Sequence, residues 1–154
     1  MINQLNRLLR LRVLREERSK RRYEKLVLLV QSCATKKDAC QERRTFAAQK
    51  LGEILKDFQL LVSTGEVCAA DFISVSKQRD YFEKLDLYYE AELIQAEYEH
   101  LEASDKCEYA RSGYLNALRE RERIEQVVEK MLKTAAAESA AKTEEEAAET
   151  WSPR

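Results

Sequence analysis

The side chains with the clearest chemistry are arginines and lysines near the start of the chain. Nine cations in residues 7–25 are answered by only Glu16, Glu17 and Glu24. A guanidinium binds a carboxylate through two parallel hydrogen bonds, so clustered arginines suit docking against an acidic surface. A solvated charged face is the alternative, because exposed ion pairs are common and contribute little. The arginines expected in this basic surface, two of them from a returning helix, are Arg7, Arg10, Arg15, Arg18, Arg22, Arg119 and Arg123.

Residue types that support catalysis or metal binding are scattered. Cys33, Cys40, Cys68 and Cys107 lack C-x-x-C spacing, and His100 is the only histidine in the sequence. The sequence contains no G-x-x-x-x-G-K-[ST] loop to hold a phosphate. We therefore expect reduced cysteines, no catalytic residues, no metal and no cofactor, and hence a protein that is not an enzyme.

Composition favours long helices. The chain has 154 residues, of which 36% are charged, with three glycines and only Pro153 as a proline. Acidic and basic residues nearly cancel, 28 against 27, so net charge predicts no nucleic-acid partner. Residues 1–12 interleave Arg with Leu and lack the apolar core of a secretory signal. The longest apolar run, residues 26–30, is too short to span a bilayer, so we expect no membrane insertion.

Seam residues recur mostly at alternating steps of three and four, which is the 3.5-residue period of a coiled coil. The second of the two rows has extra four-residue steps near Val75 to Arg79 and Tyr89 to Leu93, which would locally unwind the supercoil. The first row is Tyr23, Leu26, Val30, Cys33, Lys37, Cys40, Arg44, Ala47, Leu51, Ile54, Phe58 and Leu61. The second row is Val75, Arg79, Phe82, Leu85, Tyr89, Leu93, Ala96, His100, Ala103, Cys107, Ala110, Tyr114, Ala117, Arg121, Ile124, Val128 and Met131. The polar members Lys37 and Arg44 either fix the register of pairing or extend their stems to solvent.

A turn divides the two rows. Residues 63–66, Ser-Thr-Gly-Glu, are the only glycine-containing break between two long periodic segments. We predict helices over about 3–62 and 71–134, with a turn over about 63–70 and Asp71 as the cap of the second helix. A short turn between helices of equal length makes an antiparallel hairpin. The predicted fold is therefore all-α, a long antiparallel two-helix coiled-coil hairpin covering residues 1–134.

Folding the two rows about the turn pairs residues whose numbers add to about 136 or 137. Cys40 then faces Ala96, and Ala47 faces Tyr89, so a small side chain lies opposite a large one in the second pair. Glu16 faces Arg121, so opposite charges meet. Residues 135–154 are rich in Ala and Glu and have no helix to pack on, so we expect a flexible, frayed acidic tail. Trp151 in that tail is either incidental or a small anchor for a partner.

A row of aromatic and aliphatic side chains flanks the second seam. Its members are Tyr81, Tyr88, Ile94, Tyr98, Leu101 and Tyr109. These residues either widen the core of the hairpin or form a tyrosine-rich patch for partner contacts. With one residue from the first helix, the candidate contact residues are Phe46, Tyr81, Tyr88 and Tyr98.

The opening of the chain has a Leu/Arg-rich stretch, Leu8-Leu9-Arg10-Leu11-Arg12-Val13-Leu14-Arg15-Glu16-Glu17-Arg18. Followed by one long hairpin and an Ala/Glu-rich tail, it resembles the YscO family of bacterial type III secretion, which is similar to the flagellar export protein FliJ. The resemblance covers nearly the whole chain and implies a coiled coil like the central stalk of rotary ATP synthases. It implies a cytoplasmic location, beneath the secretion channel at the inner membrane.

The same resemblance implies partners. The basic free end, with Arg7, Arg10, Arg15 and Arg18, would enter the hexameric secretion ATPase. The half of the hairpin near the turn, with Phe46, Tyr81 and Tyr88, would lie nearer the cytoplasmic ring of the export gate. Some members of the family also bind chaperones of the translocator subunits.

Two other functions fit parts of the pattern. A generic structural coiled-coil scaffold needs only the heptads. A basic-helix DNA-binding protein of the bZIP type needs a parallel dimer with a free basic helix, whereas the second half of this chain supplies a matching seam of its own.

Overall fold

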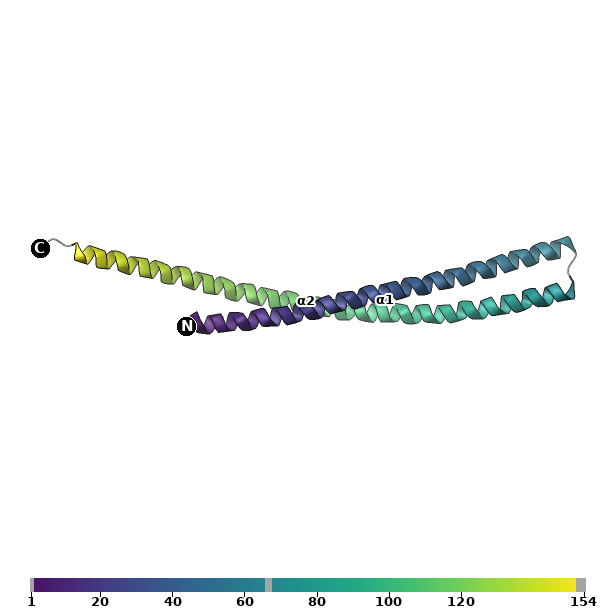
Figure 1. The fold of residues 1–154 in the computed structure, drawn as a ribbon, viewed down its shortest axis with the longest axis horizontal. Coiled ribbons are helices and arrows are strands. Elements are labelled where there is room, and N and C mark those ends of the chain that lie inside the picture. Colours follow the sequence, from purple (N-terminus) through teal and green to yellow (C-terminus); the bar gives the residue numbers. More distant parts are fainter. Residues whose placement is uncertain (1, 66–67, 152–154) are drawn as a thin grey trace. The chain divides into compact units, whose positions relative to one another are not determined.

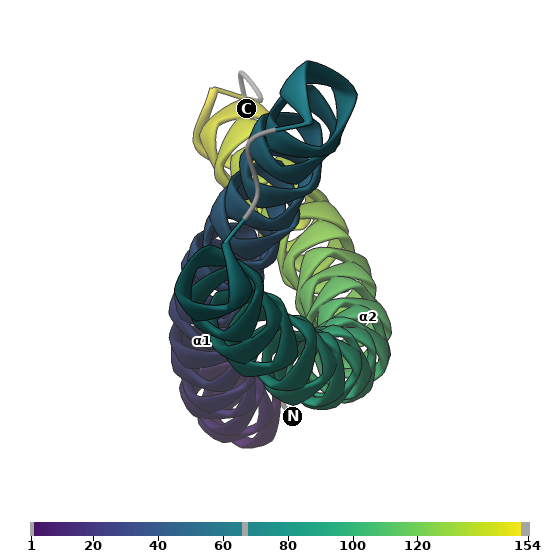
Figure 2. The same cartoon turned by 90° about the vertical axis from the view of Figure 1, so that its right-hand side faces the viewer.

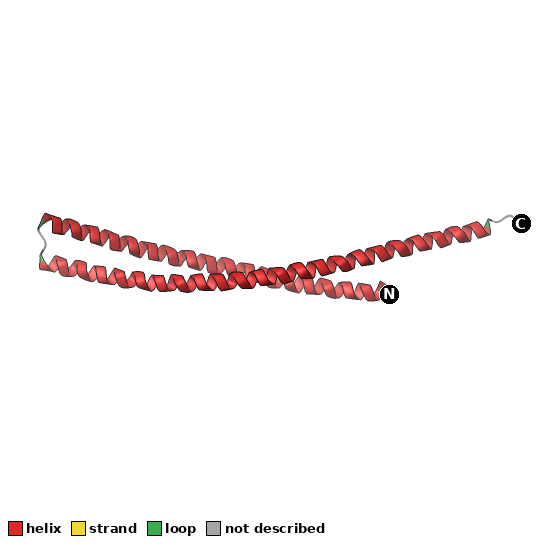
Figure 3. Ribbon diagram, turned by 180° about the vertical axis from the view of Figure 1, so that it is seen from behind, coloured by secondary structure: helices red, strands yellow, loops and turns green. Residues whose placement is uncertain are grey.

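The computed structural model describes residues 2–65 and 68–151, and only the backbone of Ile2. Two helices account for the secondary structure of this described part: α1 spans Ile2–Thr64 and α2 spans Ala69–Thr150 (Figure 1 and Figure 3). They pack together as an antiparallel hairpin, which confirms the predicted fold class. The chain forms two compact units, a turn unit of residues 26–107 and a terminal unit of residues 1–25 with 108–154.

In the turn unit, the end of α1 and the start of α2 run side by side in opposite directions (Figure 1). Figure 2 views this pair from the end where α1 stops and α2 begins. All the members of the first predicted row within this unit are buried or half-buried. The buried apolar side chains here are small except for Leu93, with Cys40, Ala47, Ala96 and Ala103 as the others. Small residues let two helices approach closely, so the core is narrow.

Cys40, Leu93 and Ala96 form a single buried cluster, and they come from both helices. Their exposed fractions are 5%, 5% and 1%. Cys40 and Ala96 are one of the pairs expected from the register in which residue numbers add to about 136. The cluster therefore confirms the predicted register in the turn unit.

Arg79 is the one member of the second row whose side chain is exposed. Its Nη2 atom lies 3.2 Å from Asp80 Oδ1, and its Nε atom lies 3.6 Å from a Glu83 carboxylate oxygen. Arg79 also lines a pocket with Leu55 and Phe58 of α1, so it lies beside the partner helix. Its charged group extends to solvent, as a long polar side chain at a seam position can.

The end of α1 follows the predicted glycine turn. Gly65 has a φ of 72°, which a residue without Cβ adopts freely, and its N–H donates to the Val62 carbonyl oxygen at 3.3 Å. The helix thus ends within two residues of the predicted boundary at about 62. Residues 66 and 67 of the predicted turn lie outside the described residues.

The start of α2 differs from the predicted cap. The helix begins at Ala69, so Asp71 lies in its first turn and Cys68 immediately precedes it. Phe72 N–H donates to the Cys68 carbonyl oxygen at 3.2 Å, and the Cys68 thiol donates to Asp71 Oδ2 at 2.9 Å. Cys68 therefore occupies the capping position, while the Asp71 carboxylate stabilises the positive end of the helix dipole.

The end of α2 also differs from the prediction. The helix continues to Thr150, well beyond the expected end at about 134. Ala, Glu and Lys have high helix propensity, which is enough to continue a helix that is already nucleated. All side chains from Leu132 to Trp151 are exposed, so this extension has no packing partner. The predicted flexibility of this tail stays a prediction, and residues 152–154 lie outside the described part.

The terminal unit is paired through polar and aromatic side chains. Glu16 is buried at 8% exposure, and Arg121 Nη1 lies 2.8 Å from its Oε2 atom. Tyr23 and Tyr114 stack nearby, with ring centroids 6.2 Å apart and planes 9° from parallel. The numbers of each pair add to 137, so the predicted register also holds in this unit.

Candidate docking surfaces

The arginine surface of the terminal unit is exposed as predicted. All seven arginines, Arg7, Arg10, Arg15, Arg18, Arg22, Arg119 and Arg123, have exposed side chains. Within the described residues, none of the seven forms an ion pair. They lie outside the seam because the inward positions of this segment are occupied by residues such as Leu9, Glu16 and Tyr23. Their guanidinium groups are therefore available to carboxylates of a partner.

A groove of about 380 Å³ lies along the two helices of the terminal unit. Its residues are Arg12, Arg15, Arg18, Ser19, Gly113, Asn116, Ala117 and Glu120. Arg12 spans the two helices to form an ion pair with Glu120. A Cβ atom at Gly113 would meet nothing within 4 Å, so its missing side chain helps to keep the groove open.

The groove contains only part of the predicted arginine set. Arg15 and Arg18 line it, whereas the other five arginines of the set lie on the surface outside it. Arg12 belongs to the same basic segment and also lines the groove, but its guanidinium group faces α2 and forms an ion pair with Glu120. The heptad position of Arg12, three residues after Leu9, was the sequence signal for this inward placement.

The aromatic residues of the turn unit are also on the surface. Phe46, Tyr81, Tyr88 and Tyr98 are 54%, 61%, 58% and 64% exposed. Ile94, Leu101 and, in the terminal unit, Tyr109 are at least as exposed as Tyr88. Of the two interpretations of this row, the surface patch is therefore the one that agrees with the structure, because core residues would be shielded from solvent.

A larger groove, of about 860 Å³, lies between the helices of the turn unit. Small side chains such as Ala39, Cys40 and Ala91 line it together with Tyr88 and Arg43. Tyr88 Oη donates to Glu92 Oε1 at 2.9 Å, and this hydrogen bond raises the pKa of the tyrosine. Arg43 Nη1 lies 3.6 Å from the other oxygen of Glu92. The rim of this groove is thus fixed by a Tyr–Glu–Arg network that the sequence analysis did not identify.

A second network lies close by in the turn unit. Lys36 Nζ is 2.6 Å from Glu99 Oε2, and the Gln95 amide donates to Glu99 Oε1 at 3.1 Å. The hydrogen bond with Glu99 raises the pKa of Lys36, and the same bond lowers the pKa of Glu99. Each group therefore favours the ionised form of the other.

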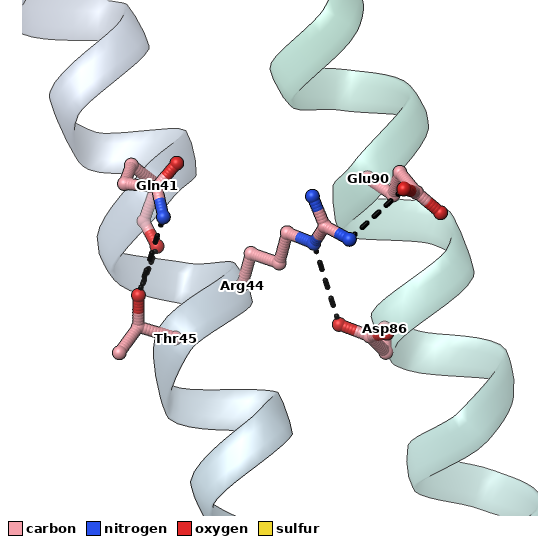
Figure 4. Close-up of polar contacts among 5 residues, drawn as sticks. All are labelled: Gln41, Arg44, Thr45, Asp86 and Glu90. Carbon is pink, nitrogen blue, oxygen red and sulfur yellow. Dashed lines mark hydrogen bonds and ion pairs between the residues drawn. The ribbon is translucent and has the colours of Figure 1, made fainter.

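Arg44 illustrates how a polar seam residue is accommodated (Figure 4). Its Nη2 atom donates to Glu90 Oε1 at 2.9 Å, and its Nε atom lies 3.6 Å from Asp86 Oδ1. The guanidinium group thus reaches from α1 to two carboxylates on α2 (Figure 4). Of the two roles considered for Arg44, fixing the register is the one these contacts support, because a slip of one helical turn would move one of the two carboxylates out of reach.

The described residues contain no group of three or more His, Cys, Asp or Glu that could hold a metal ion. No helix in the described part is both long enough and apolar enough to cross a membrane. The arginines of the terminal unit can pair with carboxylates, and the tyrosines of the turn unit can offer ring and hydroxyl contacts.

Comparisons with protein-family models, with curated protein sequences and with solved structures find no match to this chain. The resemblance in sequence pattern therefore stays an expectation. The antiparallel hairpin is consistent with that resemblance, but many unrelated proteins share this fold.

Proposed function

We propose that this chain is a cytoplasmic coupling component of a bacterial type III secretion system. It binds the hexameric secretion ATPase through the arginine surface of its terminal unit. It binds the export gate, and chaperones of translocator subunits, through the exposed aromatic residues of its turn unit. The observation that carries the proposal is that the terminal unit exposes arginines without ion pairs among the described residues, while the turn unit exposes aromatic side chains.

The arginine surface supports ATPase binding in the following way. Its guanidinium groups have no acidic partners among the described residues, so binding does not require existing ion pairs to break. Arginine forks recognise carboxylates with defined geometry, and long-range attraction accelerates association with an acidic partner. A partner with a ring of acidic residues around a central opening fits this surface.

The tyrosine-rich surface supports a different kind of contact. Tyrosine buries a large ring at low cost in conformational entropy, and it also offers a hydroxyl group for a hydrogen bond. Tyr88 is held by Glu92, so part of this surface is ordered before a partner binds. Pre-organisation of this kind increases affinity.

The test is binding of the purified chain to the secretion ATPase of the same bacterium. Reversing two charges, with Arg10→Glu and Arg15→Glu, should weaken binding at least about tenfold, because two charge-assisted contacts become repulsive. Helicity measured by circular dichroism should not change, since both side chains are exposed. The matched control is Arg111→Glu with Lys133→Glu, two exposed cations of the same unit that already pair with Glu108 and Glu129.

The possible outcomes separate the alternatives. Unchanged affinity of the Arg10/Arg15 variant contradicts the role assigned to the arginine surface. A wild-type chain that neither binds nor stimulates the ATPase contradicts the proposed function and favours a passive scaffold. Tight DNA binding that weakens steeply with salt favours a DNA-binding protein.

A further inference from the structure

A second row of apolar side chains follows α2 in the turn unit, and this row faces solvent. Leu87, Ala91, Ile94, Tyr98 and Leu101 are separated by steps of four, three, four and three. The four large side chains are 61% to 64% exposed. This spacing is the one by which the inner row packs on α1, so the outer row suits packing against another helix. We call it the α2 outer row.

The charges around the α2 outer row restrict which helix can pack on it. Residues 80–105 contain nine acidic residues and one basic residue, Lys84. Glu90, Glu97 and Glu102 are on the flanks of the row, where partner helices place their charged residues. Glu90 already pairs with Arg44 and Glu102 with Lys106, whereas Glu97 has no ion pair among the described residues. Two α2 outer rows from separate molecules would bring these acids together and repel each other. The helix that fits is therefore basic, with apolar residues at the same spacing.

The terminal unit presents such a helix face. On α1, steps of four and three connect Arg7, Leu11, Leu14, Arg18, Arg21 and Lys25. All six side chains are exposed, including the two leucines at 58% and 50%. We call this set the α1 outer row. It combines two apolar residues with four cations and contains no acidic residue.

We propose that this protein self-associates, with the α1 outer row of one molecule packing along the α2 outer row of a second. Leucines of the first row then cover Leu87 and Ile94, and the cations reach the flanking glutamates. Because the two surfaces differ, the contact is heterologous, and assembly can continue beyond a dimer. Self-association does not depend on the proposed secretion function. The two are linked in one respect, since Arg7 and Arg18 belong to both surfaces and a second copy would compete with the ATPase.

The contact should be weak and sensitive to salt. Two heptads cover less area than the roughly 1,200 Å² at the lower end of stable interfaces, so the complex should form only at high protein concentration. Sedimentation velocity of the full chain should give an average mass above the 18.0 kDa monomer at low salt. The mass should return toward the monomer at about 0.5 M NaCl, where exposed charges are screened. A monomer at every concentration in low salt overturns the proposal.

Substitutions in the α2 outer row test whether the contact between molecules lies there. Ile94→Gln with Leu101→Gln should abolish association, because it removes two of the largest apolar side chains of the row. The control Val62→Gln changes a side chain that is 54% exposed on α1 of the same unit, outside both rows, and should leave association unchanged. Wild-type association by the Ile94/Leu101 variant overturns the proposal. Circular dichroism confirms that both variants remain helical.

A charge exchange tests whether the α1 outer row of one molecule pairs with the α2 outer row of another. Arg18→Glu with Arg21→Glu replaces two of the four cations of the α1 outer row with acids, and Glu97→Lys with Glu102→Lys replaces two acids that flank the α2 outer row with cations. Each variant alone should be monomeric, and an equimolar mixture should recover association through complementary rows. A mixture that remains monomeric, when the wild type associates, contradicts the pairing of these two rows.

Discussion

The turn unit and the terminal unit share a heptad pattern but bury different chemistry. The turn unit encloses Cys40, Leu93 and Ala96, whereas the terminal unit encloses the carboxylate of Glu16 beside Arg121. Their surfaces differ as well, since the terminal unit exposes arginines and the turn unit exposes acids and tyrosines. The coiled-coil repeat thus determines which residues face inward. The type of those residues determines whether their burial mainly stabilises the unit, as apolar side chains do, or mainly fixes how the two helices pair, as an ion pair does.

The largest expected effect concerns the apolar cluster of the turn unit. Leu93→Ala should lower the free energy of unfolding by about 2–4 kcal/mol, because Leu93 is the only large apolar side chain that is buried among the described residues. Urea denaturation followed by circular dichroism measures the change. Leu101→Ala, at a position 61% exposed, is the control and should change stability by less than about 0.5 kcal/mol. Equal effects of the two substitutions would show that the cluster is not the core.

The next effect concerns the buried ion pair of the terminal unit. Arg121→Ala leaves the Glu16 carboxylate without its partner and should cost about 1–3 kcal/mol. Replacing both residues with leucine should recover most of this loss, because the unpaired charge is removed and the seam becomes apolar. Urea denaturation of both variants gives the comparison. If the double variant is as unstable as Arg121→Ala, the ion pair stabilises the folded unit by more than neutralising the buried carboxylate of Glu16.

A smaller effect on stability is expected at the exposed tyrosines. Tyr81→Ala with Tyr88→Ala should change the free energy of unfolding by less than about 1 kcal/mol, because both rings are mainly solvent-exposed. Binding to the export gate or to a chaperone should fall much more, as measured by calorimetry. A large drop in melting temperature with unchanged binding would instead assign these residues to the core.

The smallest effect is the pH dependence of the Lys36–Glu99 pair. The pKa of Glu99 lies below its ordinary value of 4.5, so its contribution is present above that pH and disappears as pH falls through the lowered pKa. The pKa of Lys36 lies above 10.5, so its contribution disappears as pH rises through the raised pKa. Glu99→Gln should therefore lower the free energy of unfolding slightly between about pH 5 and 10, and this difference from the wild type should disappear as the pH falls toward 2. A difference that persists at pH 2 would contradict a charge-based origin.

The sequence was sufficient for most of the fold because heptad spacing is a local, linear signal. Steps of three and four located the inward residues, and one glycine located the turn, so Glu16 could be matched with Arg121 in advance. The end of α2 at Thr150 depends on helix propensity without packing, so the periodicity of the seam could not locate it.

The candidate surfaces were only partly predictable. Exposure of the arginines followed from their positions outside the seam. The carboxylates that hold Arg44, and the network of Tyr88, Glu92 and Arg43, depend on how far side chains reach across to another helix. Those contacts cannot be read from spacing along one helix.

The central claim is that one chain folds back and pairs with itself in a defined register. The most direct test places spin labels at Ser32 and Ser104, in a variant without native cysteines, and measures their separation by double electron–electron resonance. Paired helices have axes about 8–10 Å apart, so the account predicts a short distance that persists when labelled protein is diluted with unlabelled protein. A separation of roughly 100 Å, as in one continuous helix, or a short distance that disappears on dilution, would contradict it.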